Sequence, residues 1–292
     1  MVLIVLIACL AAMALLYLAF LTRAVLASGP AVPRLEAVLL GAVTNFLDTL
    51  GIGSFAPTMA WMKFRGLVSD RLIPTTMLAG YTLPAMAQSA IFLVLLGVRV
   101  DAVLLVGCVV AIVAGAVVGA PIAARSSASV VQLIVALALI VAAFFYALSN
   151  FHLMPIGGQA ARLGPALTAV AIAANFGLGV LLNFGVGNFA PTVAMLSLFG
   201  MDPRLAFPIM ASGAAFAAGA AATRLVTVAD LDFRVVIGLA LGAVPAVLVA
   251  AFVVKEMPVE MLRWLVVVVV LYAAVMLLRS VASGGRGTNP TR

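Results

Sequence analysis

The feature that most constrains this sequence is a succession of long apolar segments separated by short breaks. The first runs from Val2 to Leu21, and the others cover roughly 35–62, 72–97, 102–124, 129–149, 163–199, 205–225, 234–254 and 261–279. About twenty apolar residues in a helix are enough to cross a bilayer. Because 66% of the residues are hydrophobic and 9% are charged, a soluble fold would leave large apolar patches in water. We therefore expect an all-α polytopic membrane protein.

The chemistry-bearing residue types are too few for most other classes of function. Cys9 and Cys108 both lie in apolar runs, and His152 is the single histidine, so we expect no disulfide, no metal site and no cofactor. The sixteen basic residues stand singly at the ends of apolar runs, as the positive-inside rule predicts. This spacing argues against nucleic-acid binding. No Walker loop or catalytic triad is present, so we expect no enzyme.

The two ends of the chain have different predicted roles. Residues 1–26 are expected to form an extra transmembrane helix with its N-terminus outside, because the apolar run exceeds a signal-peptide core and lacks a basic segment before it. Residues 281–292 are polar and glycine-rich, and we expect them to be a disordered cytoplasmic tail.

An internal repeat organises the rest of the chain. The sequence at 47–74 reads LDTLGIGSFAPTMAWMKFRGLVSDRLIP, and at 181–208 it reads LLNFGVGNFAPTVAMLSLFGMDPRLAFP. Without a gap, and at an offset of 134 positions, both contain Gly-x-Gly-x-Phe-Ala-Pro-Thr. This match indicates an internal duplication into repeats at 34–150 and 162–280.

The repeated segments are unusual membrane spans. The apolar stretch between Arg34 and Lys63 is too long for one helix and too short for two, and glycines lie at its centre. Two structures are compatible with this: a discontinuous span, or a re-entrant hairpin. With hairpins, eleven basic residues face inside and five face outside, which favours the hairpin by the positive-inside rule.

Hairpins have a topological consequence. Each half then contains one broken, re-entrant helical hairpin and three transmembrane helices, an odd number of crossings. The second half is therefore expected to be inverted relative to the first. Inverted repeats are typical of secondary transporters, whose substrate lies where the broken helices meet near the middle of the membrane.

Each break is expected to start a half-helix that binds an anion. Ser54 and Asn188 are suited to be N-caps, and Pro57 and Pro191 fall in the first turn, where a missing N–H costs little. Such helix N-termini attract anions, and we expect the two to cradle a small divalent anion between them. Thr58 and Thr192 lie one turn into the half-helices and either share the site or bond their own helix. The candidate substrate-binding residues are Gly51, Gly53, Ser54, Phe55, Thr58, Asn183, Gly185, Gly187, Asn188, Phe189 and Thr192.

Asp48 is an acid at the turn of the first hairpin, and its counterpart in the second half is Leu182. Intramembrane acids often couple transport to protons, and protonation would prevent Asp48 from repelling an anion. The alternative is that Asp48 caps the following half-helix. Asn45, Asn175 and Gln88 either line the path or bond neighbouring helices.

The two repeated motifs resemble the duplicated signature of the sulfite exporter TauE/SafE family. The resemblance is carried by DTLGIGSFAPT at 48–58 and NFGVGNFAPT at 183–192, and it extends over the chain from about Arg34 to Arg279. It implies a multi-pass permease of the bacterial plasma (inner) membrane. It also implies a sulfur-containing anion as substrate, such as sulfite, thiosulfate or sulfoacetate.

The sequence therefore predicts a secondary transporter of a small anion, either proton-coupled or driven by the membrane potential. An anion channel is an alternative, as is a non-transporting membrane partner of another protein. The expected partners are a small anionic solute and the lipid bilayer. Small residues at Gly213–Ala222 permit close helix packing within or between subunits. A homo-oligomer is therefore compatible with the sequence.

Overall fold

The computed structural model describes residues 2–29, 31–50, 52–69, 72–96, 99–123, 160–182, 187–228 and 230–284, with scattered residues between 133 and 148. Within these ranges the chain is helical and contains no β-strand. The α-helices are α1 (Val2–Ser28), α2 (Leu35–Thr49), α3 (Phe55–Arg65), α4 (Ile73–Leu95), α5 (Ala102–Ala123), α7 (Pro165–Leu182), α8 (Phe189–Leu198), α9 (Ala206–Val228), α10 (Phe233–Glu256) and α11 (Val259–Gly284). A short 3-10 helix, η2 (Pro203–Leu205), precedes α9.

The prediction of a multi-pass membrane protein is confirmed at the level of helix length and composition. Among the described residues, six helical segments are long and apolar enough to cross a membrane. The first, α1, packs against the protein along one narrow face, where the buried Tyr17 hydroxyl donates to the Ala79 carbonyl oxygen at 2.6 Å. Leu15 and Leu26 on α1 are 70% and 77% exposed, as expected for side chains in contact with lipid.

Most of the expected segment limits agree with the helices. The two broken segments are helix pairs, α2–α3 and α7–α8. The expected span at 129–149 and the loop at His152 lie outside the described residues. At the C-terminal end, α11 continues to Gly284, into the segment 281–292 that was expected to be a disordered tail.

The chain forms two compact units, and each combines both sequence halves. The first contains 1–98 and 211–256, and the second contains 99–210 and 257–292. The compact units therefore divide the chain differently from the predicted repeats at 34–150 and 162–280. The repeats remain a prediction.

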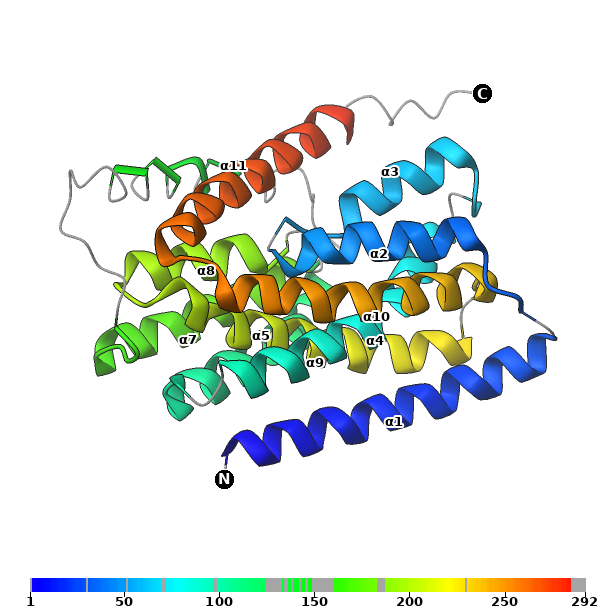
Figure 1. The fold of residues 1–292 in the computed structure, drawn as a ribbon, viewed down its shortest axis with the longest axis horizontal. Helices are drawn as coiled ribbons and strands as arrows, with labels where there is room; N and C mark the ends of the chain where they lie inside the picture. Colours follow the sequence, from blue (N-terminus) through cyan, green and yellow to red (C-terminus); the bar gives the residue numbers. More distant parts are fainter. Residues whose placement is uncertain are drawn as a thin grey trace. The chain divides into compact units, whose positions relative to one another are not determined.

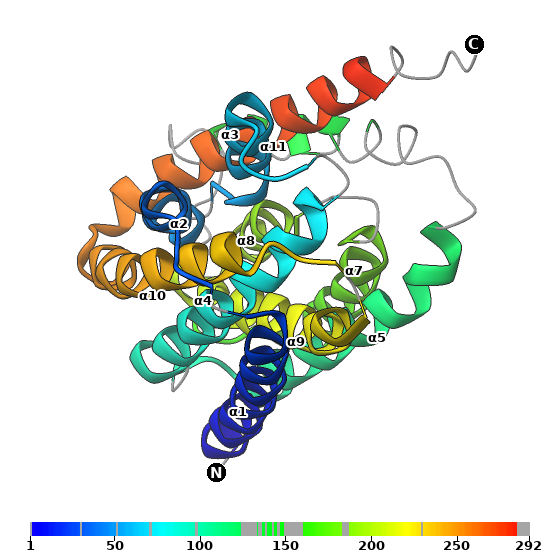
Figure 2. The ribbon, with the colours of Figure 1, turned by 90° about the vertical axis from the view of Figure 1, so that its right-hand side faces the viewer.

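In the first unit, α2 and α10 lie side by side and start at the same end (Figures 1 and 2), where the Arg34 N–H donates to the Arg234 carbonyl oxygen at 3.3 Å. Their backbones are in direct contact. A Cβ at Gly41 would lie 2.4 Å from the Leu239 carbonyl oxygen, and a Cβ at Gly242 would lie 1.8 Å from that of Val38. Only glycine fits at such a crossing.

In the second unit, α5 and α7 pair in the same way. A Cβ at Gly115 would lie 2.0 Å from the Phe176 carbonyl oxygen, and a Cβ at Gly179 would lie 2.1 Å from that of Ile112. The two pairs correspond along the chain: α7 begins 130 positions after α2 (165 − 35), and α10 begins 131 positions after α5 (233 − 102). In each unit, one helix of the first half thus pairs with one helix of the second half.

Candidate functional site

The first broken segment is a helical hairpin. The Glu36 carboxylate, in the first turn of α2, accepts hydrogen bonds from Trp61 Nε1 at 3.0 Å and from Arg65 Nε at 2.8 Å, both near the end of α3. The Arg65 guanidinium holds the pKa of Glu36 below its usual value. Because the start of α2 and the end of α3 lie together, α3 runs back along α2, as Figure 1 shows.

The second broken segment is also closed between the start of its first helix and the end of its second, but through different groups. Ala160 precedes α7, and its N–H donates to the Gly200 carbonyl oxygen at 3.2 Å. Its own carbonyl oxygen accepts from the Asp202 N–H, also at 3.2 Å. Both partners follow α8, so the start of α7 and the end of α8 lie together. Side chains close the first hairpin, whereas backbone groups close the second.

The two half-helices also end alike. Gly66 and Gly200, 134 positions apart, both adopt left-handed backbone angles, with φ of 59° and 91°. Glycine reaches this region without strain, and it is the common residue after a helix C-terminus. The bonds that stop the helices are equivalent: Leu67 N to Met62 O at 3.1 Å, and Met201 N to Leu196 O at 3.0 Å. The duplicated sequence therefore folds into duplicated local structure.

At the start of each half-helix, the expected N-cap residue has the right position but makes no side-chain cap. Ser54 precedes α3 and Asn188 precedes α8, and neither side chain bonds a first-turn N–H group. Both residues have helical backbone angles instead of the extended ones that allow capping. Asn188 instead donates from Nδ2 to the Met210 carbonyl oxygen at 3.0 Å.

Asp48 acts on the start of α3. Its Oδ1 accepts a hydrogen bond from the Ser54 N–H at 2.7 Å, across a break in which Gly53 takes a left-handed φ of 89°. A carboxylate at this place stabilises the helix dipole. The geometry is that of the capping alternative, while a role in proton coupling remains a prediction.

Thr58 belongs to a buried chain of hydroxyl groups. Its Oγ1 lies 2.5 Å from the Tyr81 hydroxyl, which lies 2.8 Å from Thr44 Oγ1. Thr44 in turn donates to the Leu40 carbonyl oxygen at 2.7 Å. The Phe55 ring packs edge-on against the Tyr81 ring, with centroids 5.8 Å apart.

The equivalent threonine in the second hairpin has different surroundings. Thr192 is fully buried, and its Oγ1 has no hydrogen-bond partner among the described residues. Its backbone N–H donates to the Asn188 carbonyl oxygen at 3.0 Å, as that of Thr58 does to Ser54 at 3.2 Å. The two threonines thus match in backbone and differ in what the hydroxyl contacts.

The remaining predicted site residues divide into four groups. Gly51, Asn183 and Gly185 lie outside the described residues. Pro57 and Pro191 are in the first turns of α3 and α8, as expected. Asn45 and Asn175 each donate to the carbonyl oxygen four residues earlier, at 3.2 and 2.9 Å, and thus bond their own helices. Phe189 is half-buried and Gly187 is exposed.

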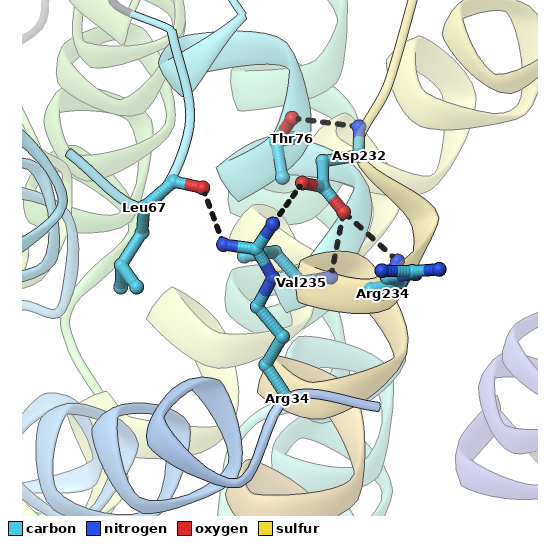
Figure 3. A network of polar contacts seen from close by, with 6 residues as sticks. All are labelled: Arg34, Leu67, Thr76, Asp232, Arg234 and Val235. Carbon is cyan, nitrogen blue, oxygen red and sulfur yellow. Dashed lines mark hydrogen bonds and ion pairs between the residues drawn. The ribbon is translucent and has the colours of Figure 1, made fainter. Parts of the chain in front are cut away.

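A polar network that was not predicted joins the first hairpin to α10. Figure 3 shows the Arg34 guanidinium between the Leu67 carbonyl oxygen, at 2.9 Å, and the Asp232 carboxylate, at 3.5 Å. Asp232 Oδ1 also accepts from the N–H groups of Arg234 and Val235, at 3.1 and 3.2 Å, and so caps α10. An acid directly before an apolar run is a known sign of an N-cap, and this sign could have located Asp232.

The second unit contains a counterpart of this network. Asp101 Oδ1 caps α5 by accepting from the N–H groups of Val103 and Leu104, at 3.0 and 3.2 Å. Asp101 also pairs with Arg162, which precedes α7, at 3.9 Å. In both units, an Asp–Arg pair joins the starts of the two parallel helices.

Tyr81 is the other residue that was not predicted. A single tyrosine within an apolar helix reads as packing, and position 215, which is 134 residues later, is Ala, so the repeat gave no signal for it. No protein-family model, curated protein or solved structure matches this chain.

Proposed function

We propose that this protein is a secondary transporter of a small anion, of the type that the sulfite exporter TauE/SafE resemblance implies. The observation that carries the proposal is the pair of short half-helices, α3 and α8. Each begins at a glycine-containing break inside an apolar hairpin, and neither is capped by the side chain of its own N-cap residue. Helix starts of this kind attract anions most strongly in a low dielectric.

The pairs α2–α10 and α5–α7 each combine one helix from each half of the sequence, and this supports the inverted-repeat part of the proposal. By position in the two repeats, α7 is the counterpart of α2 and α10 is the counterpart of α5, and α2–α10 and α5–α7 are the pairs that pack together. The substrate class is a sulfur oxyanion or organosulfonate, and the location is the bacterial inner membrane. Both of these come from the resemblance.

The experiment is transport of sulfite, thiosulfate and sulfoacetate by purified protein in liposomes, with and without a pH gradient. Saturable flux that is stimulated by counter-flow supports a carrier, whereas non-saturating flux indicates a channel. No flux and no binding of any of these anions would remove the proposed substrate class.

The same assay tests proton coupling through Asp48. Asp48→Asn keeps an oxygen that can accept from the Ser54 N–H but cannot become negatively charged. Loss of gradient-dependent flux, with the anion still bound, supports coupling. Unchanged gradient dependence leaves Asp48 as the cap of α3.

A further inference from the structure

The directions of the hydrogen bonds around Tyr81 show that the Thr58 hydroxyl already donates its proton within the protein. The Thr44 hydroxyl has one proton, which it donates to the Leu40 carbonyl oxygen. In its contact with Thr44, Tyr81 must therefore be the donor. Tyr81 then has no proton left for Thr58, so Thr58 donates to Tyr81. The single proton of Thr58 is used within the protein and is not available to an anion.

The start of α3 also has its own negative group. The Asp48 carboxylate is bonded to the Ser54 N–H at 2.7 Å, where an incoming anion would otherwise bind. A second anion at this helix start would face a like charge at close range.

The start of α8 differs in both respects. Leu182 stands 134 positions after Asp48, and the sequence contains no acid between Asp101 and Asp202. The Asn188 side chain bonds Met210 and not the first turn of α8. Thr192 is fully buried, and its hydroxyl has no hydrogen-bond partner in the described part of the chain. A helical side chain in the first turn leans toward the helix N-terminus. Leaving a buried hydroxyl unpaired lowers stability.

We propose that the transported anion is bound by the second half-helix alone, with the Thr192 hydroxyl and the first turn of α8 as donors to one oxyanion group. In the first hairpin, the protein itself fills the equivalent site. Asp48 takes the place of the ligand at the Ser54 N–H, and Tyr81 takes its place at the Thr58 hydroxyl. This inference rests on the proposed function, and it replaces a shared cradle for a divalent anion with a site for a singly charged group, such as a sulfonate.

The test is anion binding to the purified full chain by calorimetry, with sulfite, thiosulfate and sulfoacetate as probes. Thr192→Val is expected to weaken Kd about tenfold, equivalent to ~1.4 kcal/mol. Thr192→Ser restores the hydroxyl and is expected to stay within about threefold of the wild type, because the donor is kept. Thr58→Val is expected to change Kd by about twofold or less, since its hydroxyl serves Tyr81. Thr82→Val, which removes another buried threonine hydroxyl, is the matched control.

Stability without ligand gives a second measurement that does not depend on binding. Thr58→Val is expected to lower the unfolding midpoint, because Tyr81 loses a partner. Thr192→Val is expected to leave it unchanged or raise it, because an unpaired buried hydroxyl disappears.

The outcomes separate the two proposals. If the wild type binds an anion and Thr192→Val binds it equally well, the site on α8 is wrong while the transport proposal stands; a water molecule then satisfies the hydroxyl. Equal losses in Thr58→Val and Thr192→Val would overturn the asymmetry. If the wild type binds none of the probes, the proposed function fails and the site fails with it.

Discussion

Glu36 and Arg65 lie 29 residues apart in the sequence, yet their side chains meet at 2.8 Å and join the first turn of α2 to the last turn of α3. This contact shows that the first broken segment returns to the end at which it started. Because Glu36 is ionisable, a change of pH can also break this contact.

Stability should depend on pH through this pair. The pKa of Glu36 is lowered in the folded protein by Arg65, so the unfolded state binds the proton more readily. The stabilisation is present above the unfolded pKa and is lost as the pH falls through the folded pKa. We expect the unfolding midpoint of the wild type to exceed that of Glu36→Gln at pH 7, and the difference to vanish in acid. An equal difference at both pH values would show that the charge of Glu36 is irrelevant.

The Asp232 cap should be measurable separately from its ion pair with Arg34. Asp232→Ala removes both interactions and is expected to cost about 1 kcal/mol or more through the lost cap of α10. Asp232→Asn keeps a good capping oxygen and loses only the charge, so most of the stability should remain. Denaturant titration in detergent gives both values. A variant Asp232→Asn as unstable as Asp232→Ala would mean that the ion pair dominates.

The glycine crossing of α5 and α7 allows a comparison within one helix. Gly179→Ala would place a Cβ 2.1 Å from the Ile112 carbonyl oxygen, and we expect a cost of about 1–3 kcal/mol or more from overpacking. Gly177, two residues earlier in α7, has nothing within 4 Å of an added Cβ. Gly177→Ala should therefore be neutral or stabilising by up to about 1 kcal/mol, from helix propensity. Similar midpoints for the two variants would argue against this crossing.

The Tyr81 hydroxyl should have a measurable role in stability. Tyr81→Phe leaves Thr58 and Thr44 without a shared partner, at a cost of about 1–3 kcal/mol. Adding Thr58→Val to Tyr81→Phe removes one of the orphaned groups, so the double variant should be less destabilised than the sum of the single variants. Strict additivity in this double-mutant cycle would contradict the hydrogen-bonded chain.

Local signals in the sequence predicted more of this structure than long-range ones could. The glycine-containing breaks correctly indicated two helices within one apolar segment, and the contacts of Glu36 hold the start of α2 beside the end of α3. That the segment enters and leaves the membrane on one side, as the placement of Lys63 and Arg65 favoured, stays a prediction. Position alone did not predict capping: Ser54 and Asn188 precede their helices, but their backbone angles are helical. The partnership of α2 with α10 depends on contacts across nearly two hundred residues, which helical periodicity does not encode. The Tyr81 hydroxyl chain was missed for the same reason.

The pairing of α2 with α10 also has a consequence for biosynthesis. The ribosome completes α2 at Thr49 and begins α10 at Phe233, 184 residues later (233 − 49). At about 5–20 residues per second, this interval lasts roughly 9–37 s. Throughout it, the nascent first hairpin exposes the backbone face around Gly41 that Leu239 will later cover. Helix α2 therefore stays without its partner α10 until that far part of the message has been translated.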